Sequence, residues 1–106
     1  NNSHVGIYTE SVCAGIGKLN FYAFVTNGGV KYGLTKHDSL VKRWPRRLVE
    51  RVLCFVELDA IEAYNLEREC AEKFGKNRCV AVGTTEWFEC ADTEEFCSFI
   101  RRKLDV

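Results

Sequence analysis

The chain has 106 residues, of which 46% are hydrophobic and 12% aromatic, and its formal net charge is zero. These values are typical of a folded globular domain, so we expect a single domain over 1–106 and exclude a disordered chain. No apolar run approaches the roughly 20 residues of a membrane-spanning helix. No basic and apolar leader opens the sequence, so we expect neither a membrane span nor an export signal.

The first β-rich segments predict a hairpin. The runs 20–26 and 30–35 are rich in aromatic and β-branched residues, and Asn27-Gly28-Gly29 lies between them. Asn-Gly between two such runs is a strong hairpin signal, because both residues tolerate the positive φ of the turn. After the hairpin, Asp38 is the expected N-cap of a short helix over LVKRW (40–44), which Pro45 ends.

The second half of the chain predicts alternating strands and helices. The run 51–58 reads as a buried strand, and Asp59 begins a helix that extends to about Phe74. Two short strands, 78–82 and 86–90, precede a final helix from Asp92 to about Lys103. We therefore expect a small α+β domain whose mixed or antiparallel sheet, the N-terminal hairpin plus a central strand, is flanked by about three helices.

The helix over 59–74 contains an unusual acid. At 100° per residue, Glu67 falls near the middle of the face that carries Leu66, Cys70 and Phe74. A carboxylate there loses hydration and needs a cation or hydrogen bonds in compensation, which is why such placements are enriched at metal and catalytic sites. A structural salt bridge, or a helix rotated so that Glu67 lies at an edge, would explain the same pattern.

Four sequence features together resemble the GIY-YIG nuclease superfamily, in the short branch common in phages and large DNA viruses. They extend over residues 20 to about 90, the expected core. The features, in chain order, are the hairpin with YAF (22–24) and VKYGLT (30–35), the arginine of SLVKRW (39–44), LE (66–67) followed seven residues later by an aromatic, and EWF (86–88). The resemblance implies a GIY-YIG-like fold and hydrolysis of DNA phosphodiester bonds with one divalent cation, Mg²⁺ or Mn²⁺.

The resemblance also implies roles for individual residues. Tyr22 would contact and help to activate the attacking water, and Lys31 would replace the second motif tyrosine. Arg43 would hold the scissile phosphate with its planar guanidinium group. Glu67 would coordinate the metal ion, because Mg²⁺ prefers carboxylate oxygen and water. These roles require Tyr22, Lys31, Arg43 and Glu67 to converge on one face of the sheet, whereas ordinary structural roles are open to each of them.

A basic segment favours a nucleic-acid partner. Residues 31–51 contain seven lysines and arginines against two acids, although the whole chain is neutral. Local potential, rather than net charge, steers a polyanion to a protein surface. A solvated helix face remains the alternative. The residues expected to contact DNA outside the catalytic set are Lys36, His37, Lys42, Arg46 and Arg47.

The sequence leaves two alternatives open: a binding module without catalytic activity, and a secreted domain. Leu34 and Ala71 stand where active relatives often carry basic residues or histidine, so a module that binds nucleic acid or protein without cutting is the second hypothesis. Six cysteines and the Asn1-Asn2-Ser3 sequon permit a third, a secreted interaction domain with disulfides. No cysteine pair has C-x-x-C spacing, and we favour reduced thiols and an intracellular location, in the cytoplasm or nucleus of a host. DNA specificity would come from further domains in a longer parent protein, from DNA structure or from homodimerisation.

The literal triplets of the superfamily name occur earlier in the chain. Gly6-Ile7-Tyr8 and Gly15-Ile16-Gly17 spell most of it, but no Asn-Gly turn lies between them and no arginine-bearing helix follows directly. We therefore assign the motif to the hairpin over 20–35. Residues 1–18 are expected to be an N-terminal extension, with 5–9 as an extra edge strand.

Overall fold

The computed structural model describes residues 9–26, 29–74, 78–81, 84–88 and 93–105, with the side chains of 78–81 and 84–88 left aside. Its elements, in chain order, are α1 (Glu10–Ala14), β1 (Lys18–Thr26), β2 (Gly29–Thr35), the 3₁₀ turns η1 (Leu40–Lys42) and η2 (Arg46–Leu48), β3 (Arg51–Asp59), α2 (Ala60–Phe74), β4 (Arg78–Ala81), β5 (Thr84–Phe88) and α3 (Thr93–Leu104). No helix in these ranges is long and apolar enough to cross a membrane.

The strands form one antiparallel sheet in the order β3-β1-β2-β5-β4. The small α+β fold class predicted from the sequence is therefore confirmed. The β1–β2 hairpin pairs Asn20 with Thr35 at one end and Thr26 with Gly29 at the other, so its strands have the predicted positions. Residues 27–28, which carry the Asn-Gly signal, lie outside the described residues.

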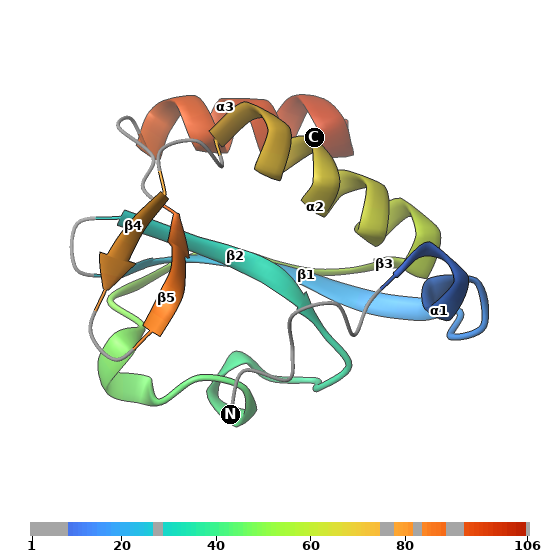
Figure 1. The fold of residues 1–106 in the computed structure, drawn as a ribbon, viewed down its shortest axis with the longest axis horizontal. Coiled ribbons are helices and arrows are strands. Elements are labelled where there is room, and N and C mark those ends of the chain that lie inside the picture. The colour runs from blue at the N-terminus through green and yellow to red at the C-terminus, as the bar shows by residue number, and fades with distance from the viewer. Residues whose placement is uncertain (1–8, 27–28, 75–77, 82–83, 89–92, 106) are drawn as a thin grey trace.

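The two faces of the sheet are covered by different elements (Figure 1). Helices α2 and α3 both lie over one face, and the segment that contains η1 and η2 lies on the other. We call these the helix face and the turn face. Both faces of β1 and β2 are covered, and β2 is buried along its whole length. This burial agrees with the many apolar residues of β1, whereas β2 also buries the polar residues Lys31 and Thr35.

The helix face carries the main hydrophobic core. Phe21 and Ala23 of β1 and Tyr32 of β2 pack there against α2 and α3. The Phe96 ring contacts the rings of Tyr32 and Phe74, with centroids 5.8 Å and 5.3 Å apart, respectively. Burial of these rings is the main source of stability in a domain of this size.

The turn face carries a second, smaller cluster. Its buried members are Tyr22, Phe24, Leu40 and Trp44. Tyr22 and Phe24 alternate along β1 with Phe21 and Ala23 of the helix face, as the period of two in a strand requires. The segment that connects the hairpin to β3 therefore packs on a hydrophobic cluster separate from the main core.

The helix predicted over 40–44 is wrong in type and in its cap. The structure has the 3₁₀ turn η1, and Ser39 rather than Asp38 caps it, its hydroxyl accepting from the backbone N–H of Val41. Asp38 instead forms an ion pair with Lys42 at 2.8 Å. Pro45 provides the reason, because proline disfavours helical geometry in the residue before it. Arg43 thus lies at the end of a tight turn and not in the middle of a helix.

The strand over 51–59 is present, but its predicted burial is wrong. β3 is an edge strand of half-buried and exposed residues, and Val52 is 51% exposed. Its apolar side chains are partly buried because Leu53 and Val56 pack against the main core and Phe55 packs against the cluster of the turn face. The helix that follows begins as predicted, since an Asp59 carboxylate oxygen accepts from the backbone N–H of Ile61 at 3.3 Å.

The C-terminal elements agree with the sequence, and the N-terminal one was missed. β4, β5 and α3 lie at or near their predicted positions. Residues 10–14, expected to be extension, form α1, in which Thr9 accepts from the backbone N–H of Val12 as N-cap. The edge strand expected at 5–9 falls mostly within 1–8, outside the described residues.

Four cysteines whose side chains the structure describes, Cys13, Cys54, Cys70 and Cys97, form no disulfide. Burial, aided by Cys97, raises the pKa of the Cys54 thiol to about 12, so it stays protonated at neutral pH. With four of the six cysteines outside any disulfide, the fold is held without the three-disulfide framework that the sequence permitted.

Candidate functional site

The candidate site begins at a close approach between the two hairpin strands. Tyr22 of β1 pairs with Gly33 of β2, and the Tyr22 ring lies across the glycine. A Cβ atom at position 33 would be 2.7 Å from the Tyr22 hydroxyl oxygen, so only glycine leaves room for it. The glycine of VKYGLT therefore fixes where the Tyr22 hydroxyl lies.

The Tyr22 hydroxyl also forms a hydrogen bond with Trp44. Its indole Nε1–H donates to the Tyr22 oxygen at 2.9 Å, and both side chains are buried, at 9% and 2% exposed. The Trp44 ring also contacts Phe24 edge-on, with centroids 5.9 Å apart. The η1 turn is in this way docked on the hairpin through a polar link inside an apolar cluster.

Two cations approach the same indole ring. The Arg43 guanidinium carbon is 4.3 Å from the ring centroid, and the Lys31 ammonium nitrogen is 5.5 Å from it. Lys31 is only 7% exposed, whereas Arg43 is half-buried. Cation–π contacts of this kind are worth about 0.5–2 kcal/mol each, more where water is excluded. Three of the four predicted catalytic residues, Tyr22, Lys31 and Arg43, are thus brought together around Trp44.

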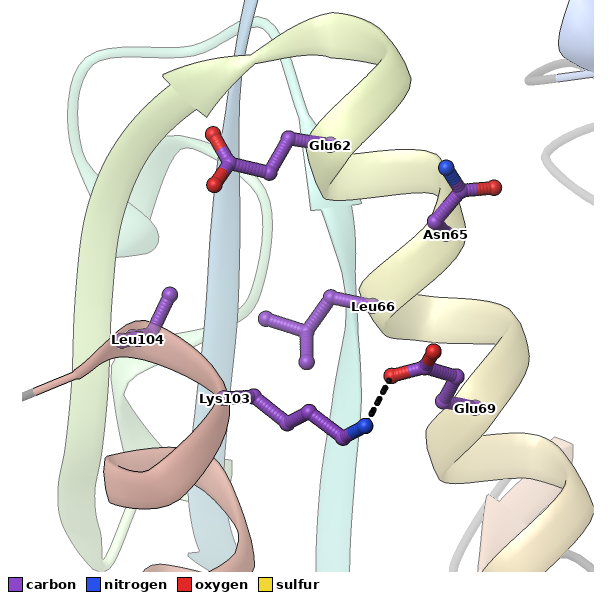
Figure 2. A pocket seen from close by; sticks show the side chains of 6 residues that line it. All are labelled: Glu62, Asn65, Leu66, Glu69, Lys103 and Leu104. Carbon is purple, nitrogen blue, oxygen red and sulfur yellow. Dashed lines mark ion pairs between the residues drawn. The ribbon is translucent and has the colours of Figure 1, made fainter.

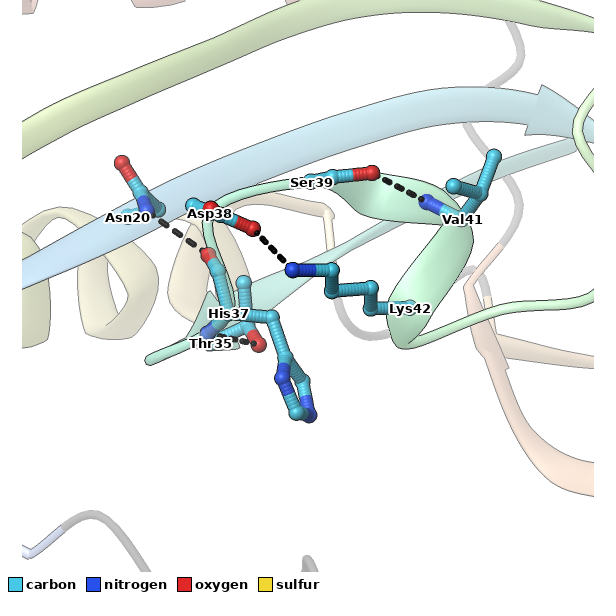
Figure 3. A network of polar contacts seen from close by, with 7 residues as sticks. All are labelled: Asn20, Thr35, His37, Asp38, Ser39, Val41 and Lys42. Carbon is cyan, nitrogen blue, oxygen red and sulfur yellow. Dashed lines mark hydrogen bonds and ion pairs between the residues drawn. The ribbon is translucent and has the colours of Figure 1, made fainter.

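Polar contacts hold the loop between β2 and η1 in place (Figure 3). The Asn20 side-chain amide donates to the backbone carbonyl of His37 at 2.9 Å, and the His37 backbone N–H donates to the Thr35 hydroxyl at 3.1 Å. The Lys42 ammonium lies on the Asp38 carboxylate, and this hydrogen bond holds the pKa of Asp38 below its usual range. These contacts fix the backbone that leads to Arg43.

The basic residues expected to contact DNA outside the catalytic set are all exposed to solvent. They lie after the end of the hairpin and on the two 3₁₀ turns, and are Lys36, His37, Lys42, Arg46 and Arg47. Exposed cations near a fixed arginine are the usual composition of a phosphate-binding surface. The turn face therefore combines buried positioning contacts with a solvent-facing positive rim.

Glu67 lies apart from this cluster. It belongs to α2, whose buried residues Ala63, Leu66 and Cys70 pack on the helix face. The expectation that all four catalytic candidates share one face is met by three of them and not by Glu67. Burial raises the pKa of Glu67, and attraction to the Lys31 ammonium opposes that rise, so Lys31 interacts with both groups.

The Glu67 carboxylate is poorly compensated. No hydrogen bond or ion pair joins it to any residue in the described part of the chain, although it is half-buried. Burial raises the pKa of Glu67, and the attraction to Lys31 opposes that rise only in part. The charge of Glu67 in turn helps burial to raise the pKa of Cys13, which packs nearby. A cation from solution would relieve this unfavourable position of the carboxylate.

The donor set fits a weakly held metal ion rather than a metal cage. Within the described ranges no three His, Cys, Asp or Glu side chains gather as ligands. Mg²⁺ is commonly held by one or two carboxylates, with water and substrate phosphate completing its shell. A single poorly compensated carboxylate, Glu67, is compatible with that mode of binding.

A separate groove lies between α2 and α3 (Figure 2). Its volume is about 220 Å³, and its lining residues are Glu62, Asn65, Leu66, Glu69, Lys103 and Leu104. Lys103 and Glu69 form an ion pair at 3.2 Å across it. The groove contains none of the predicted catalytic residues, and its largely exposed lining resembles ordinary packing between two helix ends.

Trp44 is the residue that sequence reasoning missed. Its signal was a tryptophan directly after the candidate arginine and directly before Pro45 in a basic segment. The fold and this site define the chain as a small α+β domain with an antiparallel five-stranded sheet and a basic face. Comparisons with protein-family models, curated proteins and solved structures returned no match.

Proposed function

We propose that the domain is a metal-dependent endonuclease of the GIY-YIG type that hydrolyses DNA phosphodiester bonds. The observation that supports this proposal is that Lys31 contacts the Trp44 ring beside Arg43 and also interacts electrostatically with the poorly compensated carboxylate of Glu67.

In this proposal each residue has a distinct task. Arg43 binds the phosphate, since a half-exposed guanidinium presents paired donors to two phosphate oxygens. Lys31 adds a second positive charge beside it. Glu67 holds a divalent cation, Mg²⁺ or Mn²⁺, which when bound stabilises charge on the leaving oxygen. The Tyr22 hydroxyl, fixed by Trp44 and Gly33, orients the attacking water once substrate opens access to it.

Nicking of supercoiled plasmid DNA with Mg²⁺ or Mn²⁺ tests the proposal. We expect wild type to nick the plasmid and Glu67→Gln to lose nearly all activity. Glu62→Gln removes an exposed acid from the same helix and is the matched control, expected to cut normally. Equal cutting by wild type and Glu67→Gln would show that the metal assignment is wrong.

Metal binding has a test that does not depend on cutting. A cation bound only by the folded protein raises the melting temperature. Mg²⁺ or Mn²⁺ should therefore stabilise wild type and Glu62→Gln in a thermal melt, and stabilise Glu67→Gln less. Identical shifts in all three proteins would contradict a site at Glu67.

The second candidate function is binding of nucleic acid without cleavage. It is favoured by the burial of the Tyr22 hydroxyl and by the position of Glu67 on the helix that packs the other face. A protein that binds a DNA duplex through Arg43 yet never cuts it under any metal condition would establish this function instead.

A further inference from the structure

The cluster on the turn face has Trp44 at its centre. One indole ring contacts the guanidinium of Arg43 and the ammonium of Lys31, and its Nε1–H donates to the Tyr22 hydroxyl. We infer that Trp44 is a positioning residue that holds Arg43 and Lys31 as one two-cation phosphate clamp and fixes the orientation of Tyr22. This role rests on the proposed function, because it requires a phosphate group as ligand.

The physical reason lies in side-chain freedom. Lysine and arginine lose substantial rotamer entropy when a ligand fixes them. A ring that already holds both cations has removed part of that loss before the phosphate arrives, which is preorganisation. The indole can do this because Pro45 and the η1 turn set its backbone, while Phe24 packs against its ring.

The same ring has a second, separable function. The Nε1–H donor is the only polar atom of an indole, and here it is used on Tyr22 at 2.9 Å. A phenylalanine keeps an aromatic face for the cations but has no such donor. A leucine loses both. The two substitutions therefore separate the clamp from the orientation of Tyr22.

Binding is measured first, with a fluorescein-labelled DNA duplex in EDTA, by anisotropy over a range of salt concentrations. Trp44→Leu should weaken binding about tenfold or more and flatten the plot of log K against log salt by about one unit, since each phosphate contact contributes a slope of about 0.9. Trp44→Phe should retain the wild-type slope. The control Phe24→Leu loosens the same cluster but leaves the Trp44 ring in place, and should also retain it.

Cleavage is measured second, for Trp44→Phe, Tyr22→Phe and the double variant. Trp44→Phe should cut about tenfold more slowly, the equivalent of one ordinary hydrogen bond. If Trp44 acts through the Tyr22 hydroxyl, the double variant should be no slower than Tyr22→Phe alone, because the two effects share one interaction. Additive losses would overturn the orientation of Tyr22 by Trp44.

The outcomes separate the two proposals. If the protein shows no metal-dependent cutting but its binding to the duplex depends on Trp44, the nuclease proposal is wrong and the clamp is supported. Equal salt slopes for Trp44→Leu and Phe24→Leu overturn the clamp, whatever the cutting assay gives. A wild-type protein that binds no duplex overturns the clamp as well. If Trp44→Leu does not fold, a flatter salt slope for Trp44→Phe than for wild type would overturn the clamp, because phenylalanine keeps the aromatic face on which both cations lie.

Discussion

The helix face and the turn face of the sheet are built from alternate residues of the same strands, yet they differ in kind. The helix face buries large apolar side chains under two helices, and its contacts are ring against ring or ring against aliphatic chain. The turn face has a few buried side chains, a buried lysine and a hydrogen-bonded Tyr–Trp pair under two short turns. The first arrangement provides stability, and the second fixes polar groups in position.

The largest expected difference is in stability. Phe21 is fully buried on the helix face, and Phe21→Ala should lower the free energy of unfolding by about 3–5 kcal/mol. Leu40, at the border of the turn face, is smaller and 8% exposed, so Leu40→Ala should lower it by about 2 kcal/mol. Urea denaturation measures both. Equal losses would mean that the turn face is as much a stabilising core as the helix face.

A smaller effect is expected at the contact between Tyr22 and Gly33. Gly33→Ala places a methyl group 2.7 Å from a hydroxyl that Trp44 holds, so the ring must shift. We expect a loss of about 1–3 kcal/mol in unfolding free energy, the usual range for overpacking. In Gly15→Ala, the control, the nearest atom is 3.7 Å away and stability should change little. A neutral Gly33→Ala would show that Tyr22 is not fixed in place.

The smallest effect concerns the pH dependence of stability at Glu67. Burial raises the pKa of Glu67, so the folded state favours the protonated acid more than the unfolded chain does. The stability of wild type relative to Glu67→Gln should be greatest below the ordinary glutamate pKa of about 4.3. It should then fall as the pH rises through the raised pKa toward neutrality. Urea denaturation of both proteins from acid to neutral pH measures the difference, and parallel profiles would contradict the desolvation of Glu67.

Elements whose signals are local could be predicted from the amino-acid sequence. The hairpin follows from its β-rich runs, and α2 follows from the Asp59 cap and the periodicity that ends at Phe74. The placement of Glu67 on the apolar face of α2 could also be predicted, because the period of a helix sets which residues share a face. The basic segment over 31–51 could be identified from its excess of lysine and arginine, without its contacts.

The contacts between these elements depend on the tertiary structure. It placed β3 at the sheet edge, because strand order depends on contacts between residues far apart in the chain. It made Trp44 the common neighbour of Arg43, Lys31 and Tyr22, and it put α2 with Glu67 over the opposite face. A one-dimensional pattern specifies which side of an element is apolar, but the partner that covers that side is set by packing of the whole domain.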